Sequence, residues 1–231
     1  MKILVLTSKY GLPFQRKDRD EVVELDGERH EVHFRHRHYG NVKDHRKNAL
    51  TPRARCKVDK CFAWQLYPDY DAYVHSDSTV TWNSAEAVVD FVQLMDEEGW
   101  VGFKHPQRQR VDLEAIYTDG CVRANNPYHK NRYQGEDLIG QANSYLRMAE
   151  RIGEQMPPMT ENTIFAYSKG FIRHNGTDVL TLWFAEMMRW SVQDQISLPY
   201  VMMLWGVKPV YAEGTCKDNQ WTTWSAKDHF K

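Results

Sequence analysis

Short apolar stretches alternate along the chain with longer segments whose apolar residues recur every three or four positions, the spacing of a buried helix face. The short stretches predict strands over residues 3–7, 71–76 and 100–104, and a strand or hairpin over 164–173. The longer segments predict helices over residues 51–66, 83–98, 111–118, 135–155 and 177–205. Pro199 predicts an interruption in the last of these helices, because proline lacks the N–H that a helix interior needs. Strands that alternate with helices favour an α/β sheet flanked by helices.

A hairpin is predicted near the amino terminus. Residues 21–25 and 31–35 alternate apolar and polar positions around Asp26-Gly27, a dipeptide that favours a tight turn. We expect one domain that spans residues 1–231, because no internal repeat or low-complexity linker divides the chain. We expect the hairpin to belong to a basic insertion in this domain over residues 21–50. The tail, residues 206–231, either covers a site or packs as a brace through its tryptophans, and we favour the brace.

Composition excludes several classes of protein. With 231 residues, 42% of them hydrophobic and 26% charged, the chain can bury a core and is not of the disordered type. Its longest apolar run, residues 200–207, is far short of the roughly 20 residues that cross a bilayer. Residues 3–6 are too few for a secretory signal, so we expect a cytoplasmic protein without a membrane partner. The four cysteines form no CxxC pair, which favours free thiols.

Positive charge is concentrated in one block. Residues 29–60 hold ten Lys and Arg against three Asp and Glu, a net charge of +7 in a chain whose total is −1. Histidines and aromatic residues are interleaved with these cations, which suits a surface for a polyanion such as nucleic acid. The candidate nucleic-acid contacts are Arg35, Arg37, Arg46 and Lys47. The alternative is a solvated basic loop balanced by acidic residues elsewhere in the fold.

Polar residues follow the predicted strand that ends near residue 76. His75 and Asp77 are two positions apart, so on a regular strand both face the same side. An imidazole and a carboxylate can hold Mg²⁺ or Mn²⁺ against a diphosphate, and ligands of open α/β sheets collect at the carboxyl ends of strands. The alternative is a polar turn after an edge strand.

Other candidate groups follow later strands and one later helix. His105 and Arg108 come after the strand over 100–104, and Arg173 ends the segment 164–173, so each could contact an anionic substrate. Glu186 shares a predicted helix face with tryptophans, and Asp194 lies one residue from that face. Asp194 is therefore either an N-cap of the helix that follows or a catalytic group.

A series of motifs follows one order over residues 3–205. The series comprises the opening strand with its glycine at 4–11, the basic run at 53–57, the strand from proline to aspartate at 68–78, the segment 103–108 with Glu114, Gln141 with Tyr145, and the segments 172–173, 183–186 and 191–198. In this order the motifs resemble those of a glycosyltransferase-like family best known from plant proteins linked to mucilage and cell-wall polysaccharide.

That resemblance implies a GT-A-like fold, a Rossmann-type nucleotide-binding sheet flanked by helices. It implies that Asp77, with His75 as a second ligand, binds Mn²⁺ or Mg²⁺ and the diphosphate of a nucleotide sugar, for which we expect a UDP-sugar. Further positive charge at the donor would come from Arg55, Lys57, His105, Arg108 and Arg173. Asp194 would be the base of an inverting reaction or orient the sugar in a retaining one, with Glu186 in reserve.

The acceptor is a further hypothesis. The basic block and the expected cytoplasmic location favour DNA whose hydroxymethylcytosine offers the acceptor hydroxyl, a modification of the kind that bacteriophages use. One alternative is a glycosyltransferase for a bacterial surface glycan or a lipid-linked acceptor. Another is a noncatalytic nucleic-acid-binding module on the same fold.

Overall fold

The computed structural model describes residues 1–10, 16–40, 50–96 and 99–225. The chain forms two compact units. The first unit comprises Met1–Phe103, Thr163–Thr177 and Pro209–Lys231, and the second comprises Lys104–Asn162 and Asp178–Lys208. This division into two compact units does not test the single domain expected over residues 1–231, which stays a prediction.

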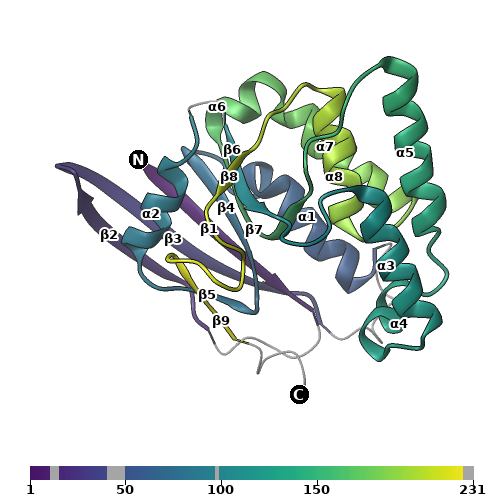
Figure 1. Ribbon diagram of the computed structural model, residues 1–231. Helices are drawn as coiled ribbons and strands as arrows, with labels where there is room; N and C mark the ends of the chain where they lie inside the picture. Colours follow the sequence, from purple (N-terminus) through teal and green to yellow (C-terminus); the bar gives the residue numbers. More distant parts are fainter. Residues whose placement is uncertain (11–15, 41–49, 97–98, 226–231) are drawn as a thin grey trace. The chain divides into compact units, whose positions relative to one another are not determined.

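Within the described residues, a seven-stranded sheet has the order β2-β3-β1-β4-β7-β6-β8 (Figure 1). Its strands are β1 (Lys2–Lys9), β2 (Arg19–Leu25), β3 (Glu28–His38), β4 (Ala72–Asp77), β6 (Trp100–Lys104), β7 (Thr160–Ser168) and β8 (Val210–Ala212). Strand β1 pairs in parallel with both β3 and β4, whereas β7 runs antiparallel to β4. The predicted α/β class, with a mixed sheet flanked by helices, is confirmed.

The predicted hairpin forms, but it is part of the sheet. Asp26 and Gly27 connect β2 to β3 with φ angles of 53° and 78°, the left-handed backbone that a tight hairpin turn requires. Strand β3 then lies between β2 and β1, so the hairpin extends the sheet, and its status as an insertion stays a prediction. The reason is burial, because Val32 and Phe34 alternate with polar residues and reach the core.

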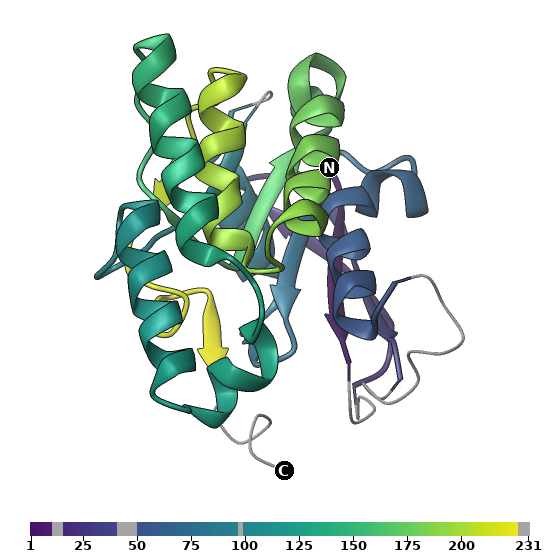
Figure 2. The ribbon, with the colours of Figure 1, turned by 90° about the vertical axis from the view of Figure 1, so that its right-hand side faces the viewer.

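One helix covers each face of this part of the sheet. Helix α2 (Ala85–Gln93) packs over β2 and β3 (Figure 1), and α1 (Pro52–Leu66) packs along β1 (Figure 2). Both begin as predicted, since the side chains of Thr51 and Ser84 accept hydrogen bonds from backbone N–H groups of the first turns. Helix α2 ends at Gln93, five residues before the predicted residue 98, and Met95, which follows it, still packs against the core.

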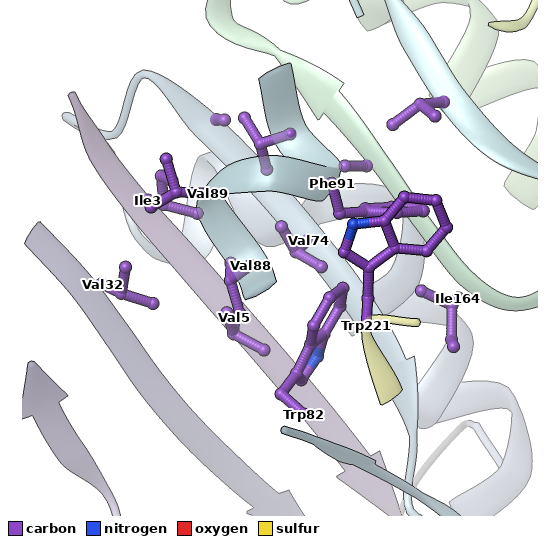
Figure 3. Close-up of a cluster of buried hydrophobic side chains, with 14 of the residues drawn as sticks. Ile3, Val5, Val32, Val74, Trp82, Val88, Val89, Phe91, Ile164 and Trp221 are labelled. Carbon is purple, nitrogen blue, oxygen red and sulfur yellow. The ribbon is translucent and has the colours of Figure 1, made fainter. Parts of the chain in front are cut away.

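The carboxyl-terminal tail contributes to the core beneath α2. Trp221 is buried, with its ring centroid 5.5 Å from that of Phe91 and 5.9 Å from that of Phe103 (Figure 3). Strand β9 (Thr222–Trp224) follows and pairs with β5 (Val80–Trp82). Trp221 therefore packs as the favoured brace interpretation requires.

The second unit is helical. Its helices are α3 (Val111–Arg123), α4 (Pro127–Tyr133), α5 (Leu138–Ile152), α7 (Thr177–Arg189, from Asp178) and α8 (Asp194–Leu204). The sequence pattern did not predict α4, and it predicted an end at residue 118 for α3, which continues to Arg123. It also misplaced the interruption between the last two helices, because Pro199 lies inside α8 and the break falls between Arg189 and Asp194. There the Ser191 hydroxyl accepts a hydrogen bond from the backbone N–H of Gln193, a local contact that competes with helix continuation.

Three remaining predictions concern the segment after β7, membrane-spanning helices and the cysteines. After β7 come α6 (Lys169–Phe171) and a π-helical segment (Ile172–Gly176), so the predicted strand or hairpin over 164–173 is a strand in its first half alone. No helix in the described ranges has both the length and the apolar composition needed to cross a bilayer. The structure shows no disulfide among the described cysteines, Cys56, Cys61, Cys121 and Cys216.

Candidate functional site

Three parallel strands end side by side in the first unit. Ser8 near the end of β1 is the register partner of Arg37 on β3 and of Asp77 on β4. Side chains at partnered positions of adjacent strands point to the same face, which here is the face covered by α1. The structure thus places Arg37, predicted as a nucleic-acid contact, in one row with Asp77, the predicted donor-binding residue.

His75 and Asp77 form a hydrogen-bonded pair at the end of β4. Nε2 of His75 lies 3.2 Å from Oδ1 of Asp77, the His75 side chain is 4% exposed and that of Asp77 is 47% exposed. Burial, and next the nearby ammonium group of Lys60, lowers the pKa of His75 to about 4. The imidazole is therefore neutral at pH 7, so we place a hydrogen on Nε2, which donates it to the carboxylate.

Asp77 stays ionised although its surroundings are crowded. Burial raises the pKa of this carboxyl, but Lys60, His75 and Lys57 together lower it by more, and the net shift is downward. Lys60 is itself 4% exposed, and its Nζ lies 5.7 Å from the ring centroid of Phe165. The same ring stacks on His75 with centroids 5.3 Å apart, so Lys60 and His75 both pack near Phe165.

The first turns of α1 lie over the strand ends. Arg55 donates a hydrogen bond of 2.9 Å to the backbone carbonyl of Tyr39, and its guanidinium carbon lies 5.1 Å from the centroid of the Tyr39 ring. Asp59 accepts a hydrogen bond of 2.5 Å from the Tyr39 hydroxyl and lies 3.2 Å from a guanidinium nitrogen of Arg37. We call the whole group the strand-end cluster, which consists of Arg37, Tyr39, Arg55, Lys57, Asp59, Lys60, His75 and Asp77.

The donor atoms of this cluster do not fit a divalent metal. Within the part of the chain that the structure describes, no three His, Cys, Asp or Glu side chains gather closely enough to hold an ion. The pair of His75 and Asp77 supplies one nitrogen and one carboxylate, whereas Mg²⁺ prefers several oxygen ligands. Lys60 already places a positive charge beside both groups, and like charges repel.

The predicted nucleic-acid contacts have acidic partners where the structure describes them. Arg35 forms an ion pair of 2.5 Å with Asp20, and Arg37 pairs with Asp59. Arg46 and Lys47 lie outside the described residues. The part of the basic block that lies on β3 is therefore balanced by neighbouring carboxylates, and its role in nucleic-acid binding stays a prediction.

Arg173 is not at the strand-end cluster. Because β7 is antiparallel to β4, Ser168 at the end of β7 is the register partner of Ala72 at the start of β4. Arg173 follows five residues later, beyond the sheet edge opposite to the one where Asp77 lies. The sequence pattern placed the residues after every strand at the same end of the sheet. It could not show that β7 runs the other way, because the direction of a strand depends on which strands it pairs with.

His105 and Arg108 of the second unit belong to a buried polar network. Nδ1 of His105 accepts hydrogen bonds from the backbone N–H groups of Gln107 and Arg108, at 3.2 and 2.9 Å. Arg108 forms an ion pair with Glu114, which is 3% exposed and also accepts a hydrogen bond of 2.8 Å from Gln193. These contacts hold a turn and α3 together, and the predicted role of His105 and Arg108 at the donor stays a prediction.

Glu186 and Asp194 are also buried in the second unit. Glu186 accepts a hydrogen bond of 2.8 Å from the Tyr145 hydroxyl. Asp194 is the first residue of α8, where a carboxylate complements the helix dipole. The N-cap position belongs to Gln193, one residue earlier, so the N-cap interpretation of Asp194 is wrong. The backbone carbonyl of Asp194 accepts a hydrogen bond of 3.1 Å from the Trp183 indole.

The sequence pattern missed Asp59 and Lys60 as site residues. A signal was present, because Cys56, Asp59, Lys60 and Ala63 recur at the spacing of a single helix face. Charged residues on a face that also carries Ala63 are unusual, since a buried charge needs a partner. No protein-family model matches the sequence, and a search of curated proteins finds no match.

Proposed function

We propose that this protein is a glycosyltransferase that moves a sugar from a nucleotide sugar, which we expect to be a UDP-sugar, to an acceptor hydroxyl. The observation that carries the proposal is the row formed by Arg37, Ser8 and Asp77 at the ends of three parallel strands. In open α/β sheets, ligands bind outside the carboxyl ends of the strands. A GT-A-like form of the sheet is part of this proposal.

The cations of the strand-end cluster suit the leaving diphosphate. Arg37 and Arg55 present guanidinium groups, which match phosphate oxygens in geometry, and Lys57 adds a further charge. The half-exposed carboxylate of Asp77 is ionised and can accept hydrogen bonds from hydroxyl groups of the donor. The cluster thereby offers partners to both parts of a nucleotide sugar.

The transfer replaces one bond to the sugar by another. The bond between C1 of the sugar and the diphosphate oxygen breaks, and its electron pair stays on the diphosphate. The acceptor oxygen forms the new bond to C1 and gives its proton to a base. We assign that base to Asp194, with Glu186 in reserve. Positive charge at the diphosphate stabilises the leaving group as it departs.

We further propose duplex DNA with hydroxymethylcytosine as the acceptor. The net charge of +7 over residues 29–60 supports a polyanionic partner. Since Arg35 and Arg37 have acidic partners, the proposal assigns most of the DNA contact to Arg46 and Lys47.

The test measures release of nucleoside diphosphate from a panel of nucleotide sugars, with Mn²⁺ and with EDTA. Each reaction is run with hydroxymethylcytosine DNA, with unmodified DNA and with detergent-solubilised lipid acceptor. We expect release that depends on the modified DNA. We expect Asp77→Asn to lower turnover by about 100-fold, the effect of losing one transition-state contact, when the assay is run at a temperature where circular dichroism shows the variant to be folded. Asp90→Asn, which changes an exposed carboxylate on α2, is the matched control and should keep full activity.

Each other outcome rejects a defined part of the proposal. Release with lipid acceptor alone, or release indifferent to DNA, rejects the DNA acceptor and keeps the transferase. Full activity of Asp77→Asn rejects the assigned site. DNA binding without affinity for any nucleotide sugar rejects the enzyme and favours the noncatalytic module.

A further inference from the structure

Lys60 is a buried lysine within the strand-end cluster. Its side chain reaches from α1 to the sheet face, where Nζ lies 5.7 Å from the centroid of Phe165. Phe165 is the register partner of His75 and stacks on it. A buried ammonium group is costly unless an anion balances it, and the carboxylate that completes this group is Asp77, 3.2 Å from His75.

The same carboxylate is the one that a divalent cation would need. Oδ1 of Asp77 already accepts a hydrogen bond from Nε2 of His75, so binding of a metal by this pair would first have to break that bond. The other ring nitrogen, Nδ1 of His75, is buried and has no hydrogen-bond partner among the described residues. His75 and Asp77 thus already interact with each other and with the neighbouring ammonium group of Lys60.

The charges of the cluster match a diphosphate without added metal. Arg37, Arg55, Lys57 and Lys60 supply four positive charges against the two carboxylates of Asp59 and Asp77, a net charge of +2 when histidine is left out of the count. A nucleoside diphosphate carries two to three negative charges at neutral pH, roughly the complement of this value. A metal ion would add two more positive charges beside Lys60, where they are repelled.

We infer that Lys60 takes the place of the divalent cation that the family resemblance implies, so that the protein binds the diphosphate of its donor without a metal. This inference rests on the proposed function, and it changes the expected cofactor from Mn²⁺ or Mg²⁺ to a side chain of the protein. Lys60 is in this view a diphosphate-binding residue, and Asp77 holds it in place.

The first experiment measures the affinity of the full chain for UDP by calorimetry, in EDTA and in Mn²⁺, with GDP and ADP as further probes. We expect the dissociation constants in the two buffers to agree within about threefold. Lys60→Met removes the charge and keeps the length of the side chain, and should weaken binding in EDTA by at least about 30-fold, as truncation of a buried charge pair does. Lys208→Met changes an exposed lysine in the second unit and should bind as the wild type does.

Two results would overturn the inference alone. Wild-type binding that requires Mn²⁺, or unchanged affinity of Lys60→Met in EDTA, rejects the role of Lys60 and leaves the transferase standing. Failure of every nucleoside diphosphate to bind in either buffer rejects the proposed function and this inference together.

A second measurement needs no variant. Free Mn²⁺ gives a six-line paramagnetic resonance signal that is lost when a protein binds the ion. We expect that the signal of Mn²⁺ with UDP does not fall when one equivalent of the wild-type protein is added. Loss of one equivalent of the signal would reject the inference even if Lys60→Met did not fold.

Discussion

Asp59 makes the stability of the protein depend on pH in an unusual direction. Its side chain is fully buried, and Oδ1 is shared by the Tyr39 hydroxyl and Arg37, whereas Oδ2 is buried without a hydrogen-bond partner. Burial raises the pKa of this carboxyl from 3.8 to about 6, against the lowering effect of Tyr39 and Arg37. The folded protein therefore holds the Asp59 proton more tightly than the unfolded chain does.

The size of the effect follows from this shift. A change of about two pKa units corresponds to about 3 kcal/mol, so ionised Asp59 lowers the free energy of unfolding by about that amount. Since the folded pKa is the higher one, the free energy of unfolding falls as pH rises from about 4 to about 6, and the loss is complete above the folded pKa. Asp59→Asn cannot ionise and should lack this loss.

The assay compares urea unfolding of the wild type and Asp59→Asn at several values between about pH 4 and about pH 7. The asparagine places an N–H₂ group where Oδ2 lacks a partner, which costs roughly 1–3 kcal/mol at every pH. The measured quantity is therefore the change with pH and not the absolute value. The pKa of Cys56 is raised to about 12, so this thiol does not titrate in the window, and His75, whose pKa is about 4, is present in both proteins.

Two results would refute this reasoning. The first is a difference in unfolding free energy between the wild type and Asp59→Asn that stays constant over the whole pH range. The second is direct, because carbon NMR of the Asp carboxyl groups reports each pKa and the resonance missing from Asp59→Asn identifies Asp59. A titration near 3.8 would show that burial does not dominate. Asp90→Asn, at an exposed position of α2, serves as the control and should keep the pH dependence of the wild type.

Two further predictions concern the core of each unit. Trp221→Ala should lower the free energy of unfolding by about 3–5 kcal/mol in urea titrations, whereas Trp205→Ala, at a site 40% exposed, should cost less than about 1 kcal/mol. Equal losses would show that the tail does not support the core. Glu114→Gln should cost about 3–5 kcal/mol, because Arg108 keeps a partly buried charge without its partner. Adding Arg108→Met should recover part of that loss, and strictly additive losses in the double variant would contradict the ion pair.

Local signals in the sequence determined where most elements begin. Asp26-Gly27 adopts the left-handed turn that its residue types favour, and Thr51 and Ser84 cap the helices that follow them. These features depend on contacts within a few residues, which the sequence displays directly. The α/β class, and the position of Asp77 at a strand end, follow from the same local patterns.

The tertiary structure alone decided which of these residues meet. Arg37, Ser8 and Asp77 are far apart along the chain, and they form one row because β3 and β4 pair on either side of β1. Arg173 ends up beyond the other edge of the sheet because β7 is antiparallel. Strand order, direction and register are set by burial of apolar side chains from distant segments, and no stretch of the sequence carries that information by itself.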